Sequence, residues 1–366
     1  MKAAKIIKLL DNWTPRYLVD KWDNTGFQIG DPEVKIRKIL IALDLDRRVL
    51  EKALEIDANM IITHHPIIFT PLKSLNKLSY KESLIYDIIK EDIVVYNAHT
   101  NLDMANGGVN DTLAKILGIK NPRLLKPIYE ENLYKLVVFV PNSHRDLILQ
   151  VLGDEGAGYI GNYSHCTYNV EGIGTFMPHL GANPYLGTVN QLEKVEETRI
   201  ETIVEEKDLK KVINAMIKAH PYEEVAYDIY KLANRGKEFG YGRIGEIEEI
   251  YLDEYLKIIK EKLDTEYLTV YGNRDKTIKT VALCGGSGAS FIKDAFLNKA
   301  DVYITGDIKY HDAQYGDELG LTIVDAGHFH TEKVILPVIK EYLERNIKGT
   351  IEIEIYQESS PPYIVV

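Results

Sequence analysis

The sequence predicts an α/β fold with mixed, largely parallel sheets, interrupted by an inserted α+β module. Short apolar runs alternate with amphipathic helical patterns before residue 129, and the same alternation resumes after residue 240. Such alternation is typical of parallel sheets that are covered by helices on both faces. The simplest architecture is one α/β domain built from residues 1–129 and 239–366, with residues 130–238 as the insert.

Size and composition fit this view and exclude several classes of protein. The chain has 366 residues, 45% of them apolar, and a formal net charge of -11, so a nonspecific nucleic-acid binder is not expected. Two cysteines cannot form a disulfide framework, which favours a reducing compartment. The N-terminus lacks the apolar stretch of a signal peptide, and no segment approaches the roughly 20 apolar residues that span a bilayer. We therefore expect a cytoplasmic protein with no membrane partner.

The first part of the chain predicts three strands and three helices. The strands are continuous apolar runs, as expected in a buried parallel sheet, and the helices show apolar residues at helical spacing. The predicted strands cover residues 39–43, 60–63 and 93–96, and the predicted helices cover residues 2–10, 47–55 and 79–89.

The pattern changes near residue 130, where strands dominate. The order of elements is close to the β-α-β-β-α-β order of a ferredoxin-like module. A stretch rich in Gly, Pro and Asn, residues 177–187, is predicted to be a loop within it. The predicted strands are 134–140, 163–170, 172–177, 195–204 and 224–230, and the predicted helices are 143–152 and 208–219.

The last part of the chain returns to alternating strands and helices. Residues 285–288, Gly-Gly-Ser-Gly, are predicted to form a turn between a strand and a helix, where backbone N–H groups could bind phosphate. Their spacing is not that of nucleotide-binding loops, so the nucleotide signal is weak. The predicted strands are 280–284, 301–305, 321–325 and 350–356, and the predicted helices are 252–263, 289–298, 309–319 and 332–345.

Metal-ligand residue types follow several of the predicted strands. His64 and His65 come directly after the apolar run 60–63 and precede Pro66, which favours a break in the chain there. Because strand ends converge at one edge of an α/β sheet, both histidines could bind an ion. The alternative is that one histidine binds a metal or a substrate and the other is a core residue with its hydrogen bonds satisfied.

Two further clusters have the same position relative to a strand. His99 and Asp103 follow the run 93–96, and a carboxylate is the usual bridge between two ions. His328 and Glu332 lie four residues apart at a helix start, which places them on one face. Read singly, Asp103 could cap a helix and Glu332 could be a first-turn carboxylate. Three such clusters in one domain nevertheless indicate a metal site.

A fourth cluster is less specific. Asp307 and His311 also follow a strand and lie four residues apart. We expect them at the rim of the site, with His311 as a candidate general acid or base. The alternative is a helix N-cap followed by a surface histidine.

Five segments together resemble the signature segments of the Nif3-like dinuclear-metal family, whose bacterial members are called GTP cyclohydrolase 1 type 2 homologues. The resemblance covers nearly the whole chain, and the segments occur in the family's order. They are Trp22-Asp23-Asn24-Thr25-Gly26, Thr63-His64-His65-Pro66, His99 to Asp103, Thr305-Gly306-Asp307 with His311, and Asp325 to His328 with Glu332.

The resemblance implies a Nif3-like α/β domain with a dinuclear metal centre, and the ferredoxin-like insert of the longer family members. It implies His64, His65, Asp103, His328 and Glu332 as the metal ligands, with the two carboxylates as bridges. Zinc is the first choice for the two divalent ions, with iron, manganese, nickel or cobalt as alternatives. The family also implies a homohexamer, a trimer of dimers.

Two functions from different classes are compatible with these residues. The first is a metal-dependent hydrolase of a small molecule, such as a nucleotide, in which a metal-bound hydroxide opens a ring as in a GTP cyclohydrolase. In that case His99 or His311 would be the catalytic acid or base. The second is a non-catalytic, metal-binding regulatory or metal-handling oligomer.

Overall fold

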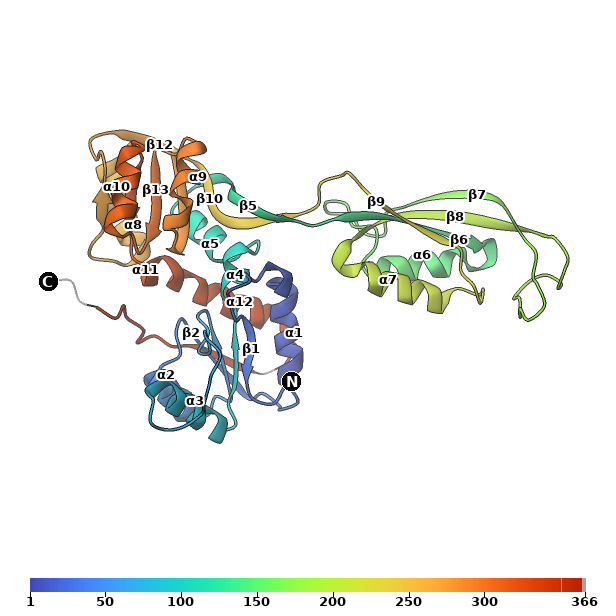
Figure 1. The fold of residues 1–366 in the computed structure, drawn as a ribbon, viewed down its shortest axis with the longest axis horizontal. Coiled ribbons are helices and arrows are strands. Elements are labelled where there is room, and N and C mark those ends of the chain that lie inside the picture. Colours follow the sequence, from blue (N-terminus) through green and yellow to red (C-terminus); the bar gives the residue numbers. More distant parts are fainter. Residues whose placement is uncertain (350, 364–366) are drawn as a thin grey trace. The chain divides into compact units, whose positions relative to one another are not determined.

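The computed structural model describes residues 1–349 and 351–363 and divides into two compact units. The first unit comprises Met1–Tyr129 and Phe239–Val366, and the second comprises Glu130–Glu238. Figure 1 shows both units, with helices packed on the sheets in each. Within the described residues, no helix is long and apolar enough to cross a membrane.

The first unit contains a five-stranded mixed sheet in the order β1-β4-β3-β2-β15. All neighbouring strands are parallel except β1, which runs antiparallel to β4 at one edge. Its strands are β1 (Gly26–Ile29), β2 (Lys38–Ala42), β3 (Met60–Thr63), β4 (Val94–Asn97) and β15 (Glu352–Ile355).

Helices cover both faces of this sheet because the strand residues are apolar on both sides. In β2, Ile39 and Ile41 pack in one core with the first and last helices of the unit, whereas Leu40 and Ala42 pack in another core on the opposite face. The helices are α1 (Ala3–Trp13) and α12 (Leu336–Asn346) on the first face, and α2 (Arg47–Glu55) and α3 (Tyr80–Lys90) on the second.

The second sheet of this unit is six-stranded and mixed, in the order β11-β14-β13-β12-β10-β5. Its three central strands are parallel, and β10 and β11 pair antiparallel with their neighbours β12 and β14. The strands are β5 (Lys120–Glu130), β10 (Glu238–Tyr251), β11 (Thr269–Tyr271), β12 (Thr277–Ser287), β13 (Val302–Gly306) and β14 (Thr322–Asp325).

Two further cores bury the faces of the second sheet. Helices α5 (Val109–Ile116) and α8 (Leu252–Leu263) contribute to one core, and α9 (Ile292–Leu297) contributes to the other. The remaining helices of the first unit are short or lie near the sheet edges. They are α4 (Thr100–Met104), α10 (Tyr310–Glu318), α11 (His328–Glu332), and the 3-10 turns η1 (Arg16–Leu18), η3 (Ala289–Phe291) and η4 (Lys333–Ile335).

The second unit is a four-stranded antiparallel sheet in the order β7-β8-β6-β9, with two helices that share its core. The chain order of its elements is β-α-β-β-α-β, with a 3-10 turn before the first helix. The elements are β6 (Leu133–Pro141), η2 (Asn142–His144), α6 (Arg145–Asp154), β7 (Thr167–Phe176), β8 (Glu193–Glu205), α7 (Glu206–Ala219) and β9 (Tyr227–Lys231).

The structure confirms the α/β class and its mixed sheets, but several predicted elements are wrong in detail. The predicted strands 163–170 and 172–177 are one strand, β7, because residues 167–176 pair continuously with β8. Residues 285–287 extend strand β12 instead of forming the predicted turn. A short helix already begins at His328, ahead of the helix predicted at 332–345. Residue 350 of the predicted strand 350–356 lies outside the described residues.

Candidate metal centre

The ends of strands from both sheets of the first unit deliver the candidate ligands to one place. His64 and His65 follow β3, and their backbone N–H groups both donate to the carbonyl of Leu43, which fixes the turn of the chain. His99 and Asp103 follow β4 and belong to the cap and last turn of α4. Helix α11 follows β14 and carries His328 and Glu332 at its two ends.

The predicted metal ligands converge on Glu332. Its Oε2 atom lies 3.0 Å from Nε2 of His65 and 3.0 Å from Nε2 of His328. The Nε2 atom of His64 lies 3.6 Å from Oε1 of Glu332 and 3.6 Å from Oδ1 of Asp103. Three overlapping groups of ligand atoms, each within 4.8 Å, thus form around these residues, and His99 joins His64 and His65 in one of them.

Each of the four histidines is held by its other ring nitrogen. Nδ1 of His64 donates to the carbonyl of Ala98 at 2.7 Å. In the other three rings Nδ1 donates to a carboxylate. The pairs are His65 with Asp44 at 2.8 Å, His99 with Asp23 at 2.9 Å and His328 with Asp307 at 2.6 Å. Partners of this kind fix the tautomer and the ring orientation of metal-binding histidines and leave Nε2 free to bind an ion.

Three buried atoms of the cluster have no hydrogen-bond partner among the described residues. These are Nε2 of His64, Oδ1 of Asp103 and Oε2 of Glu332, and His64 is fully buried. An unpaired buried polar atom is costly, so native proteins rarely retain one without a water, an ion or a ligand. All three atoms face the same cluster. The donor set of imidazole nitrogens and carboxylate oxygens therefore fits a bound divalent metal ion.

The electrostatics of the cluster depend on Glu332. Burial opposes the ionisation of this carboxyl, but the facing histidines outweigh it and hold its pKa well below the usual range. Burial by itself would lower the pKa values of His65 and His328. Hydrogen bonds to carboxylates outweigh this effect and raise the two pKa values to about 10 and about 9. Without metal, protons on these two imidazoles therefore balance the buried negative charge.

The pKa values of the other two candidate ligands, His64 and Asp103, shift in the opposite directions: the pKa of the histidine is lowered and that of the carboxyl is raised. Burial is the main reason why the pKa of His64 is lowered, so this imidazole is neutral and ready to bind a cation. Burial, with the nearby charge of Glu332, raises the pKa of the Asp103 carboxyl well above its ordinary value. A positive ion bound between these side chains would stabilise the ionised carboxylate of Asp103 and so offset the rise in its pKa.

Glycines of β12 allow the strand to approach Glu332 closely. A methyl group at position 286 would clash with Oε1 of Glu332, and Gly286 has a φ of +65, which disfavours other residues. The glycine-rich segment thus makes room for a buried carboxylate in this unit. Its role in the structure differs from the phosphate-binding turn considered from the sequence.

The cluster opens into a cavity of about 480 Å³. Aromatic side chains line it beside the polar ones. Trp22 and Phe69 pack with ring centroids 5.9 Å apart, and the ring of Trp22 lies 6.0 Å from that of His99. Tyr241 and Phe291 stack at 5.1 Å and also line the cavity. The cavity therefore combines hydrophobic ring surfaces with a potential metal centre.

Two further histidines, His311 from the sequence analysis and His330 beside the predicted ligand His328, lie outside the cluster. His311 is exposed in the first turn of α10 and is not among the residues that line the cavity. The structure thus gives no contact between His311 and the predicted ligands. His330 is buried and packs against the rings of Tyr267 and Phe329, on the side of α11 away from His328.

Sequence reasoning did not identify Asp44 or the hydrogen-bonding role of Asp23. Both hold histidines of the cluster, at 2.8 and 2.9 Å, yet neither has the spacing of a ligand motif. The available signals were the position of Asp44 after strand β2 and the place of Asp23 in the segment Trp22-Asp23-Asn24-Thr25-Gly26. Asp307 was expected at the rim, and it does contact the exposed edge of His328.

The sequence matches one family model along almost its full length. The model describes Duf34/NIF3 (NGG1p interacting factor 3), and the match covers residues 1–362. A Halalkalibacterium halodurans protein named GTP cyclohydrolase 1 type 2 homolog is 45% identical over 352 residues, which cover 95% of this chain and 94% of that protein. A Bacillus subtilis protein of the same name is 43% identical over 92% of this chain and 90% of its own.

Solved structures are similar over the whole chain as well. The crystal structure of a Bacillus cereus protein related to NIF3 has a TM-score of 0.92 and 43% sequence identity, and the match covers 100% of this chain and 99% of that one. A Staphylococcus aureus protein matches with a TM-score of 0.78 and 28% identity over the same shares of the two chains. Sequence and structure agree, and the chain belongs to the Duf34/NIF3 family.

Proposed function

We propose that this protein is a dinuclear metal-dependent hydrolase that acts on a small molecule. His64, His65, Asp103, His328 and Glu332 would hold two divalent ions, with zinc as the first choice and iron, manganese, nickel or cobalt as alternatives. The observation that carries the proposal is that the Nδ1 atoms of four histidines are all engaged, which directs their Nε2 atoms into the cluster. A structural core would have no need of this arrangement.

Such ions lower the pKa of water to about 7 and so supply a nucleophile at neutral pH. The chain's own residues would then orient the substrate and move protons. His99 lines the cavity and donates Nδ1–H to Asp23, so its Nε2 atom carries the lone pair that accepts a proton. The carboxylate of Asp23 stabilises the imidazolium that forms, because the ion pair is partly shielded from water.

The walls of the cavity support a planar ring as the substrate. Trp22, Phe69, Tyr241 and Phe291 offer ring faces on which a heteroaromatic base can stack. The relatives' name, GTP cyclohydrolase 1 type 2 homolog, supports a guanine nucleotide. In this proposal water adds at C8 of the base, the bond from C8 to a ring nitrogen breaks, and His99 returns its proton to that nitrogen.

A second candidate is a non-catalytic, metal-binding regulator or metal-handling oligomer. The observation that favours it is the second unit, which carries a cavity of its own and none of the proposed ligands. For either function we propose a cytoplasmic homohexamer, a trimer of dimers, which rests on the family resemblance. The two functions differ in one measurable property, namely turnover at full metal occupancy.

The experiment is an assay of the metal-loaded protein with GTP, followed by liquid chromatography and mass spectrometry. The expected product is heavier than GTP by one water. Glu332→Gln should abolish its formation, because it removes the carboxylate at the centre of the cluster, whereas Glu318→Gln on exposed α10 should not. Full metal loading without turnover of GTP, or of a panel of nucleotides and phosphoesters, would contradict the proposed hydrolase activity. It would favour the non-catalytic, metal-binding regulator.

A further inference from the structure

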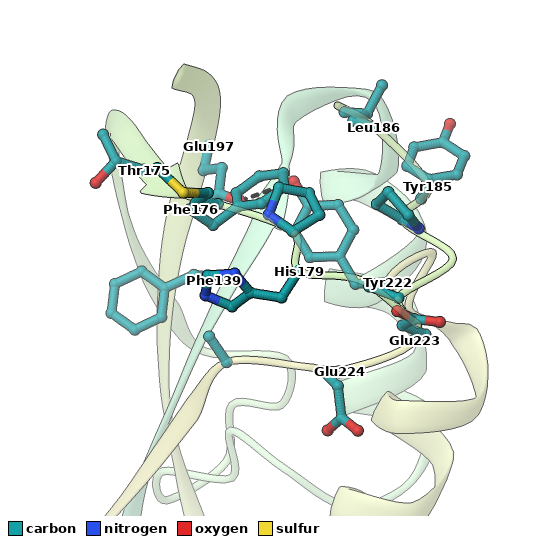
Figure 2. Close-up of a pocket in the computed structure, with 16 residues that line it drawn as sticks. Phe139, Thr175, Phe176, His179, Tyr185, Leu186, Glu197, Tyr222, Glu223 and Glu224 are labelled. Carbon is teal, nitrogen blue, oxygen red and sulfur yellow. Dashed lines mark hydrogen bonds between the residues drawn. The ribbon is translucent and has the colours of Figure 1, made fainter. Parts of the chain in front are cut away.

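The second unit contains a cavity of about 580 Å³ that is separate from the metal centre. It is lined by the end of β7, the loop that follows, and the segment after α7, with contributions from β6 and β8. Figure 2 shows the labelled rings of Phe176, His179, Tyr185 and Tyr222 gathered about this space, with Glu197 beside them. The loop after β7 is the Gly/Pro/Asn-rich stretch near residues 177–187.

Aromatic rings form much of the cavity wall. The centroid of the Tyr222 ring lies 6.0 Å from that of Phe176 and 6.3 Å from that of Tyr185. Phe139 on β6 lines the cavity as well. Rings from four different segments thus surround one space, and each can present the partially negative face of its π-system to a ligand.

The charged groups on the wall are all carboxylates. Glu197, Glu223 and Glu224 line the cavity, and no lysine or arginine is found among its lining residues in the described chain. Glu197 is only 9% exposed and accepts a hydrogen bond from the hydroxyl of Tyr222 at 2.9 Å. A buried carboxylate and aromatic faces both attract positive charge, and the wall holds no fixed cation that would bind a phosphate.

Hydrogen bonds hold these groups in place. His220 is buried, and its ring bonds the carbonyl of Phe139 through Nε2 at 3.0 Å and accepts from the backbone N–H of Tyr222 through Nδ1 at 3.1 Å. The carboxylate of Glu223 accepts from the backbone N–H of Asn183 at 2.9 Å and so fixes the loop over the cavity. The buried groups of the wall, Glu197 and His220, are therefore fixed by hydrogen bonds within the unit.

We propose that this cavity binds a small organic cation, an amine or quaternary ammonium compound with an apolar body. The cation would lie against the rings of Phe176, Tyr185 and Tyr222, close to the carboxylate of Glu197. Attraction between a cation and aromatic faces is strongest where water is excluded, which a concave aromatic wall favours. This ligand class lies beyond the proposed hydrolysis, whose substrate is anionic, and gives the second unit a sensing function of its own.

The test is isothermal titration calorimetry of the full-length protein with choline and with 3,3-dimethylbutan-1-ol, its uncharged carbon isostere. The measurement is made near pH 8, at which free imidazole is neutral. We expect choline to bind about tenfold or more tightly than the alcohol, because only choline gains cation–π and carboxylate attraction. Equal binding of the two, or binding of neither at millimolar concentration, would overturn the proposal.

Matched variants locate the site. Glu197→Gln keeps the shape of the side chain and should weaken choline binding about tenfold, since it removes the buried charge. Glu201→Gln on the same strand, whose carboxylate pairs with Arg199 and Lys135 outside the cavity, should leave it unchanged. If Glu197→Gln fails to fold by circular dichroism, Tyr185→Leu removes an exposed ring of the wall instead, and unaltered binding in that variant would contradict the assignment.

Discussion

The Nε2 atoms of His65 and His328 lie 3.3 Å apart, although 263 residues separate the two side chains in the sequence. His65 follows β3 of the five-stranded sheet, and His328 begins the helix after β14 of the six-stranded sheet. Both atoms also lie 3.0 Å from the same oxygen of Glu332. The proposed metal centre therefore exists only when the two separated segments of the first unit have folded together.

Metal binding should release protons. The pKa values of His65 and His328, about 10 and about 9, are those of the metal-free protein, so both imidazoles are protonated at pH 7.5. A metal binds only neutral imidazole, and affinity must therefore fall as the pH is lowered below about 9. We expect a release of at least about two protons per chain at pH 7.5, measured by zinc titration calorimetry in buffers of different ionisation enthalpy. A signal independent of the buffer would contradict this assignment.

Asp307→Asn should weaken metal binding without disturbing the backbone. Asp307 has a φ of +56, a conformation that asparagine also adopts readily, and its carboxylate accepts from Nδ1 of His328 at 2.6 Å. The amide is a poorer acceptor and can present its NH₂ group instead. Loss of such a partner typically lowers affinity about 10–100-fold. Competition with a chromogenic chelator measures the change, and Asp317→Asn on exposed α10 is the control.

Gly286→Ala should displace Glu332. The added methyl group would clash with Oε1 of this buried carboxylate, and the positive φ of the glycine adds strain. We expect a loss of about 1–3 kcal/mol in the free energy of unfolding and a metal affinity lowered at least about tenfold. Gly320→Ala, at an open position with a φ of +70, shares the backbone strain and lacks the clash. Equal metal affinity in both variants would refute the steric role of Gly286.

His99→Gln should separate the two candidate acid–base residues. His99 lines the cavity and is held by Asp23, whereas His311 is exposed outside it. We expect kcat for ring opening to fall about 100-fold or more in His99→Gln, with metal content retained, and His311→Gln to behave as the unaltered protein. A large loss in His311→Gln instead would assign the role to that residue.

The sequence allowed the α/β class and most helices and strands of the first unit to be predicted, because their apolar runs are continuous and their helical spacing is regular. Strands β1, β5, β10 and β11 were not identified. Strands β1 and β11 are short, β5 is largely exposed, and β10 contains three glycines and lacks a clear alternation of apolar residues. The extension of β12 through Gly285 and Gly286 was also missed. Local glycine content favours a turn, but the strand continues past an irregularity at these glycines, and Ser287 pairs with Gly306 of β13.

The candidate ligands could be found from the sequence because each follows an apolar strand, and parallel strands end at a common edge. The residues that hold them could not, since Asp44 meets His65 only after the chain has turned at Leu43. Ala98 takes part through its backbone carbonyl, a group that every residue carries, so its identity gives no signal. The cavity of the second unit was missed for a similar reason. Its rings come from four segments that the antiparallel sheet and its loop bring together.

The most direct test of the central claim is the metal content of the purified, untagged protein, measured by plasma mass spectrometry. The unaltered chain and Glu318→Gln should each contain about two transition-metal ions per chain, as a dinuclear centre requires. The double variant His64→Ala/Glu332→Ala should lose both, because it removes the buried imidazole and the carboxylate on which the cluster converges. A content near zero in the unaltered chain, or an equal content in the double variant, would contradict a metal centre at these residues.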